Sequence, residues 1–136
     1  MGRILALDIG DRRIGVAVSD PMGVIASPYT VIDRKYTPDY LAEISKIIIN
    51  RSIDKLVVGI PLNMKGQASA QTEKVSKMIL ELKSYFDLPV ISIDERLSSI
   101  SAEKSLQQQG VKTGHNKGDI DKTAAAIFLQ EYLDSI

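Results

Sequence analysis

Short apolar runs separated by polar turns dominate the first third of the chain. Residues 3–9 and 14–18 are such runs, and the polar stretch GDRR between them is typical of two paired strands joined by a tight turn. Residues 24–32 predict a third strand, which Pro28 either places at an edge of the sheet or breaks, because proline cannot donate to a strand ladder. Three consecutive strands with short connections indicate an antiparallel meander.

Apolar residues at helical spacing predict helices in the rest of the chain. The first helix is expected to have Thr37 as its N-cap and Pro38 in its first turn. Its buried stripe consists of Leu41, Ile44, Ile47 and Ile48. A longer second helix buries Val75, Met78, Ile79, Leu82 and Phe86. A weaker helix is expected over 97–108, and a last one over 121–134.

Two further apolar runs, at 55–60 and 89–93, are compact enough to form buried strands between these helices. The resulting order of elements indicates the α/β class. We expect a mixed five-stranded sheet, in which two parallel strands extend the three-stranded antiparallel meander, flanked by helices. Ligands of such sheets favour the carboxyl ends of the parallel strands, so the candidate site is expected there.

The composition is that of an ordinary globular domain. Of 136 residues, 44% are hydrophobic and 25% are charged, so we expect residues 1–136 to form a single domain. The sequence has neither an apolar run that could cross a bilayer nor the pattern of a secretory signal. The lack of cysteine excludes disulfides, thiolate metal sites and a cysteine nucleophile. We therefore expect a soluble, cytoplasmic protein.

Charge gives little support to any single class of partner. Seventeen basic residues balance 17 acidic ones, whereas nucleic-acid-binding proteins usually carry a basic excess. The basic residues do form small groups, which are Arg12 with Arg13, Arg34 with Lys35, and Lys112 with Lys117 and Lys122. A carboxylate that binds a cation also counts as acidic without repelling nucleic acid.

Asp8 and Glu95 are candidate metal ligands at the ends of predicted strands. Asp8 lies in the apolar run LALDIG, where a carboxylate is costly unless it is paired, hydrogen-bonded or bound to a cation. It could instead cap the turn and pair with a neighbouring arginine. Glu95 follows the run PVISI, where an ordinary surface salt bridge is the alternative. Strand alternation allows only one of Asp94 and Glu95 to share a face with Asp8.

Asp121 is the third candidate, at the start of the last predicted helix. It shares a helix face with Ala125, Phe128 and Tyr132, which are expected to pack on the sheet. The alternative is that Asp121 compensates the helix dipole in the first turn, although Asp119 could serve as the cap. Three carboxylates at one edge would repel one another without a cation. All-oxygen ligands suit Mg²⁺ or Mn²⁺, in a two-metal arrangement that needs no histidine or serine nucleophile.

Two loops could contact phosphate groups near these carboxylates. The glycine-rich loop before Asp121 carries Lys112, His115 and Lys117, and either closes over nucleic acid or is simply solvated. The loop 61–69 contains Lys65 and precedes a helix, whose exposed N–H groups can bind an anion. It could equally be a plain connection.

Four segments taken together resemble the successive motifs of the YqgF (RuvX-like) family: LALDIGDRRIGVAVSD, VVGIPLNMKGQAS, DERLSS and DKTAAAIFLQEYL. The similarity extends from residue 3 to about residue 133, in order and with fitting spacing. Two departures are visible. Ser98 and Ser99 replace the threonines that commonly end the third motif, and the loop before Asp121 is less basic than expected.

This resemblance implies a ribonuclease H-like fold and a bacterial cytoplasmic nuclease. The family comprises Holliday junction resolvases and nucleases that mature the 5′ end of pre-16S ribosomal RNA. Its acidic residues fall on Asp8, Glu95 and Asp121. The basic groups and the two loops described above supply the expected nucleic-acid-binding residues, which are Arg12, Arg13, Lys65, Lys112 and Lys117. The substrate is therefore branched DNA or an rRNA precursor, and the protein a monomer or a homodimer.

Two other functions remain open at this level. The segment LDIGDRRIGVA also resembles the phosphate-binding hairpin of actin-like and sugar-kinase ATPases. Those enzymes bind ATP between two such domains, and 136 residues supply only one. The other alternative is an inactive nucleic-acid-binding or processing accessory module, because a fold does not guarantee an activity.

Overall fold

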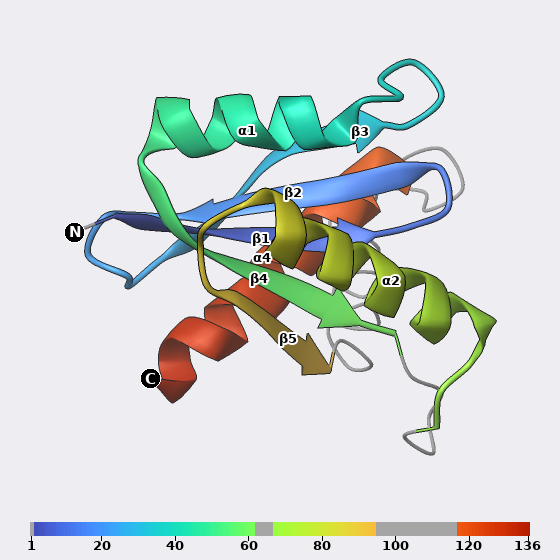
Figure 1. The fold of residues 1–136 in the computed structure, drawn as a ribbon. Helices are drawn as coiled ribbons and strands as arrows, with labels where there is room; N and C mark the ends of the chain where they lie inside the picture. Colours follow the sequence, from blue (N-terminus) through green and yellow to red (C-terminus); the bar gives the residue numbers. More distant parts are fainter. Residues whose placement is uncertain (1, 62–66, 95–116) are drawn as a thin grey trace.

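The computed structural model describes residues 2–61, 67–94 and 117–136, and for residues 117–121 it describes the backbone only. The helix predicted over 97–108 lies outside the described residues. Figure 1 shows a single sheet with helices on both of its faces.

The sheet has five strands in the order β3-β2-β1-β4-β5. Their bounds are β1 Arg3–Ile9, β2 Arg13–Ser19, β3 Ala26–Asp33, β4 Ile53–Ile60 and β5 Val90–Asp94. Strands β1, β2 and β3 pair antiparallel, and β4 and β5 continue the sheet parallel to β1. The predicted fold class is confirmed, including the edge position of the strand that contains Pro28.

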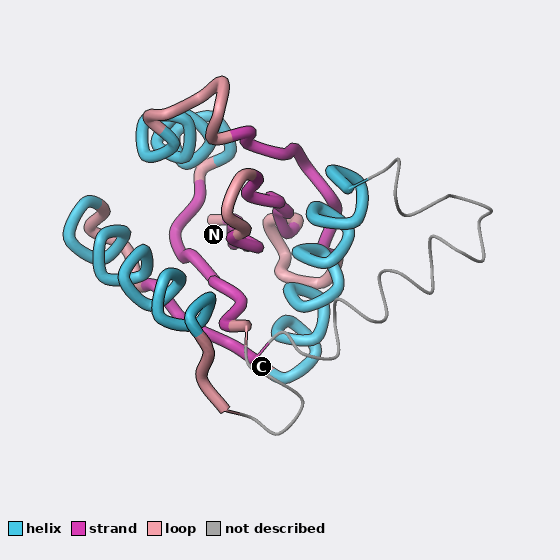
Figure 2. The backbone as a smooth tube through the Cα atoms, turned by 90° about the vertical axis from the view of Figure 1, so that its right-hand side faces the viewer, coloured by secondary structure: helices cyan, strands magenta, loops and turns pink. Residues whose placement is uncertain are grey.

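Three described helices cover the sheet: α1 Tyr40–Arg51, α2 Ala70–Tyr85 and α4 Lys117–Ser135. Helices α1 and α2 lie on one face and α4 lies on the other (Figure 2). The strands supply both cores by alternation. Leu5, Leu7 and Ile9 of β1 belong to the core beneath α1 and α2, whereas Ile4 and Ala6 belong to the core beneath α4.

The first helix begins later than the sequence predicts. Its N-cap is Asp39, whose side chain accepts a hydrogen bond from the backbone N–H of Ala42 at 3.2 Å. The prediction of Thr37 as N-cap, with Pro38 in the first turn, was therefore wrong. Aspartate is the stronger N-cap residue, and a cap at 39 places the proline before the helix, where its missing N–H costs nothing.

The last helix begins earlier than predicted, at Lys117 instead of residue 121. Asp121 therefore lies in its second turn and does not open the helix, and Asp119 lies within the first turn and is not its cap. The predicted packing face is confirmed, because Ala125 and Phe128 are buried and Tyr132 packs against the same core.

Helix α4 is tied to the start of the edge strand by Gln130. Its side-chain oxygen accepts from the backbone N–H of Ala26 at 2.9 Å, and its amide nitrogen donates to the carbonyl of Val24 at 2.8 Å. Ala26 pairs with Ser19 of β2, whose hydroxyl accepts from the backbone N–H of Ile4 in β1 at 2.8 Å. Gln130 is therefore level with the beginning of β1. It lies in the second half of α4, and the helix runs in roughly the opposite direction to that strand (Figure 1).

The turn between β2 and β3 depends on a charged carboxylate. Asp20 accepts backbone N–H bonds from Ile25 at 2.9 Å and Val24 at 2.7 Å, and these bonds hold its pKa below the ordinary value of 3.8. A lowered folded-state pKa contributes stability above pH 3.8, which is lost as the pH falls through the folded value.

Thermal unfolding measured from about pH 5 down to about pH 2 should therefore show a progressive decrease in Tm. The Asp20→Asn variant, which cannot ionise, is expected to start from a lower Tm and to lose less of it over this range. Equal slopes for the two proteins would contradict this role of Asp20.

Candidate metal site at the carboxyl edge of the sheet

Asp8 lies near the carboxyl end of β1 and is partly buried. Strand alternation places it on the same face as Ile4 and Ala6, which is the face that α4 covers. A carboxylate at the end of a central strand in a mixed sheet is in the position where such sheets bind ligands.

Glycines flank Asp8 on both neighbouring strands. Gly15 of β2 is its direct partner across the antiparallel pair. On the other side Leu7 pairs with Val58, so the next position along both strands places Gly59 beside Asp8. Both glycines are buried. The residues that lie opposite Asp8 on the two adjacent strands therefore have no side chains.

The backbone of α4 brings Asp121 to the same end of the sheet. Asp121 is nine residues before Gln130, which corresponds to about 13 Å along a helix. Asp8 is four residues after Ile4, which corresponds to about 13 Å along a strand. Because α4 begins towards the carboxyl end of β1 (Figure 1), the backbone of Asp121, in the second turn of α4, lies towards the same end of the sheet as Asp8. Helical spacing also puts Asp121 on the face of Ala125.

The third candidate lies just beyond the described part of β5. Strand β5 ends at Asp94, which pairs with Ile60 and so lies on the face opposite to Asp8. Glu95 follows it outside the described residues. No group of three acidic or histidine side chains able to hold a metal ion occurs among the described residues, and Asp8 is the one member of the predicted trio whose side chain is described.

The chemistry of these positions fits a hard divalent cation. Asp8 supplies carboxylate oxygen in a partly buried position, where its charge is costly without compensation. Gly15 and Gly59 add no side chain of their own on either side of it. Small residues of the same core, Ala6 and Ala125, allow the helix and the sheet to approach closely.

The structure describes the side chains of only some of the predicted phosphate-binding residues. Arg12 is exposed and forms a salt bridge with Asp33 at 3.3 Å, which raises the pKa of the guanidinium. Arg13 begins β2 at the same end of the sheet. Lys65 and Lys112 lie outside the described residues, as does His115. Lys117 opens α4 at this edge, with only its backbone described.

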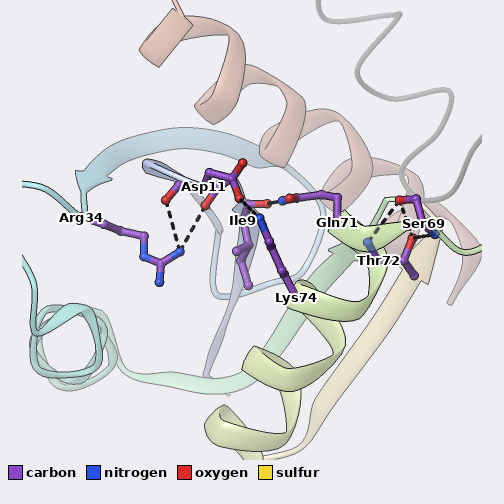
Figure 3. A network of polar contacts seen from close by, with 8 residues as sticks. Ile9, Asp11, Arg34, Ser69, Gln71, Thr72 and Lys74 are labelled. Atoms are coloured by element: carbon purple, nitrogen blue, oxygen red, sulfur yellow. Dashed lines mark hydrogen bonds and ion pairs between the residues drawn. The ribbon is translucent and has the colours of Figure 1, made fainter.

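Side chains that sequence reasoning missed support the end of β1 (Figure 3). Gln71, in the first turn of α2, donates to the carbonyl of Ile9 at 3.3 Å. Lys74 pairs with Asp11 at 3.2 Å, and Arg34 donates to the carbonyls of Gly10 and Asp11 at 3.4 Å. These contacts join residues far apart in the sequence, so no local pattern indicates them.

The start of α2 is also closed by its own side chains. Ser69 accepts from the backbone N–H of Thr72, while the Thr72 hydroxyl accepts from the backbone N–H of Ser69 at 2.9 Å. The same hydroxyl donates to the carbonyl of Pro61, just after β4. The capping box thus fixes the end of α2 that faces the carboxyl edge.

Residues 2–135 match the model of a protein family described as "RuvX: Holliday junction resolvase". The chain belongs to the RuvX family. It is thus a member of a nuclease family, and the predicted resemblance is confirmed over nearly the whole chain. Among the described residues, no helix is both long and apolar enough to span a membrane.

Relatives of this RuvX family member share the name "Putative pre-16S rRNA nuclease". The one from Desulforamulus reducens is 46% identical, over 98% of this chain and 97% of the relative. That from Chloroflexus aurantiacus is 43% identical, over 97% of this chain and 86% of the relative. The Clostridium novyi protein is 40% identical, over 98% and 99% respectively.

Solved structures support the ribonuclease H-like fold. The RuvC of T. thermophilus in complex with a Holliday junction substrate aligns with a TM-score of 0.58 at 10% identity, covering 99% of this chain and 95% of RuvC. The fowlpox virus resolvase in its Holliday junction complex aligns with a TM-score of 0.57 at 15% identity, covering 98% and 97%. At such low identity, these likenesses establish the fold alone.

Proposed function

We propose that this RuvX family member is a divalent-metal-dependent nuclease that hydrolyses a phosphodiester bond in a precursor of 16S ribosomal RNA. The observation that carries the proposal is the partly buried Asp8 between two buried glycines at the carboxyl edge of the sheet. The choice of an rRNA precursor rests on the names of relatives that match along almost their whole length.

Asp8, Glu95 and Asp121 are the proposed ligands of Mg²⁺ or Mn²⁺. Two such ions, when bound, supply an activated water and stabilise the leaving oxygen. The protein's part is to hold carboxylate oxygens in a fixed geometry. Asp8 is fixed by a central strand, and Asp121 by a helix that Gln130 ties to the same sheet. Arg12, Arg13, Lys65, Lys112 and Lys117 are the proposed contacts to phosphate groups.

We further propose that residues 1–136 act as one domain in the cytoplasm, as a monomer or a homodimer. Branched DNA is the second candidate substrate, favoured by the description of the family and by the Holliday junction in the RuvC complex of the same fold. A symmetric dimer would suit a four-way junction, and a monomer would suit the trimming of an RNA end.

The test compares labelled precursor 16S rRNA with labelled four-way junction DNA, each with Mn²⁺, with Mg²⁺ and with EDTA. We expect metal-dependent cleavage of the precursor at its 5′ side. Cleavage of the junction alone would identify branched DNA, and not the rRNA precursor, as the substrate. It would not contradict the proposed metal site. Binding without cleavage under every metal condition would favour an accessory module, and ATP hydrolysis without cleavage would favour the actin-like alternative.

A further inference from the structure

A group of basic residues surrounds an exposed tyrosine at the same end of the sheet. Arg12, Lys35 and Tyr36, with Arg34 beneath them, are here called the tyrosine platform. The Tyr36 residue is 72% exposed, so burial in the core does not account for an aromatic ring here. The Arg12 guanidinium carbon lies 5.9 Å from the ring centroid, and the Lys35 ammonium nitrogen lies 5.5 Å from it.

Hydrogen bonds hold the platform in place. The backbone N–H of Arg34 donates to the carbonyl of Arg12 at 2.7 Å, which joins the segment after β3 to the β1–β2 turn. The carbonyl of Asp33 accepts from the backbone N–H of Tyr36 at 3.1 Å. The Asp33 carboxylate accepts from the backbone N–H of Lys35 at 3.0 Å and from Arg12 at 3.3 Å. The ring is thus presented by an ordered turn.

Arg34 acts as a support. Its guanidinium lies over the ring of Tyr40, 5.2 Å from the centroid, and donates to the carbonyls of Gly10 and Asp11. Packing and backbone contacts therefore explain Arg34. Tyr36 differs, because its ring contacts only the side chains of Arg12 and Lys35 among the cation–π pairs of the described residues and the residue stays largely exposed.

The local charge is positive although the chain as a whole is neutral. The two segments 11–13 and 33–36 contain four basic residues and two acidic ones. Both acidic residues already have cationic partners, since Asp33 pairs with Arg12 and Asp11 pairs with Lys74. A shallow depression next to the platform is lined by Asp11, Arg12, Arg34, Lys35 and Pro38.

The platform is close enough to Asp8 to contact one substrate molecule. Arg12 lies in the turn that directly follows β1, and the segment 34–36 follows β3, two strands away in the sheet. Across the sheet, two strand spacings amount to about 10 Å, and Arg34 lies three residues, or about 10 Å, beyond Val31, which is level with Asp8. Nucleic acid with a phosphodiester at Asp8 therefore needs only a few further nucleotides to reach Tyr36.

We propose that the tyrosine platform binds a single-stranded flank of the nucleic-acid substrate, with one base stacked on Tyr36 and adjacent phosphates near Arg12 and Lys35. An exposed aromatic ring between cations is the arrangement that binds single strands without sequence preference. This inference rests on the proposed nuclease function and adds the part of the substrate that the platform contacts.

A tryptophan introduced at position 36 tests the stacking directly, because the chain contains no tryptophan of its own. Tyr36→Trp is made in an Asp8→Asn background, which is intended to bind without cutting. Tyr85→Trp is the matched control. Tyr85 is 55% exposed and lies at the C-terminal end of α2, away from the carboxyl edge of the sheet. The probes are end-labelled single-stranded oligouridylate and oligothymidylate, followed by anisotropy and by tryptophan fluorescence.

We expect the oligonucleotides to quench the fluorescence of the Tyr36→Trp protein but not that of the Tyr85→Trp protein, and Tyr36→Ala to raise the Kd about tenfold. Lys35→Ala should raise the Kd and also weaken its dependence on salt. Binding by anisotropy without quenching in the Tyr36→Trp protein, or an unchanged Kd for Tyr36→Ala, would overturn the platform and leave the nuclease proposal intact. Quenching in the Tyr36→Trp protein together with no cleavage by the wild-type protein would support the tyrosine platform and contradict the nuclease proposal.

Discussion

The Asp8→Asn variant is expected to lose metal-dependent cleavage by a factor on the order of a thousand or more, equivalent to about 4 kcal/mol of transition-state stabilisation. The substitution keeps the shape of the side chain but removes its negative charge from the proposed ligand set. Its effect on the fold is measured separately in the metal-free protein, because Asp8 is partly buried. Initial rates with Mn²⁺ and the Tm without metal measure the two effects.

Asp87→Asn is the matched control, an exposed aspartate just before β5 and thus at the opposite end of that strand. It should cut like the wild type. Glu95→Gln and Asp121→Asn are expected to cause losses similar to that of Asp8→Asn, and the double variants should lose little more than the single ones. An Asp8→Asn protein that cuts at the wild-type rate would end the metal-site proposal.

The Gly15→Ala variant is expected to weaken Mn²⁺ binding and to reduce cleavage by about a hundredfold. The new methyl group would lie directly across from Asp8 on the same face of the sheet, and displacements of about 1 Å in a site can cost this much. Calorimetric titration with Mn²⁺ measures binding separately from cleavage. Gly59→Ala, on the other side of Asp8, should act in the same direction.

Adding a methyl group elsewhere in the sheet should leave both measurements unchanged. Ser27→Thr adds a methyl group at an exposed position of β3, and threonine is a residue type that is common in strands. The Tm of each glycine variant must also be recorded, because both glycines are buried. If Gly15→Ala and Gly59→Ala bind Mn²⁺ and cut like the wild type, the space beside Asp8 has no role in the site.

Periodicity was sufficient to predict the sheet and the three described helices. Apolar runs located the five strands, and the strand with Pro28 lies at an edge, which is one of the two outcomes that this proline allowed. Predictions of helix ends were less accurate. Thr37 and Asp39 are both acceptable N-caps by residue type, and only the hydrogen bond to Ala42 decides between them. Residues 117–120 look like part of a polar loop, yet they extend α4 by a turn.

The candidate site was predictable only in part. Asp8 is conspicuous as a charge in an apolar run, but its two glycine neighbours are remote in sequence. Their arrangement depends on the register of β1 with β2 and with β4, which pattern alone does not specify. The tyrosine platform was not predictable from local sequence either, because Arg12 and Tyr36 come into contact only when the turns after β1 and β3 lie side by side.

The side chain of Gln130 has a consequence for how copies of this protein can associate. The outward-facing carbonyl of Val24 and N–H of Ala26, which an incoming strand would need, are already bound to that amide. Alternation places the nitrogen of Pro28 at the next outward position, where it has no hydrogen to offer. The first half of the outer edge of β3 therefore cannot pair with a further strand, and a homodimer would have to form through another surface.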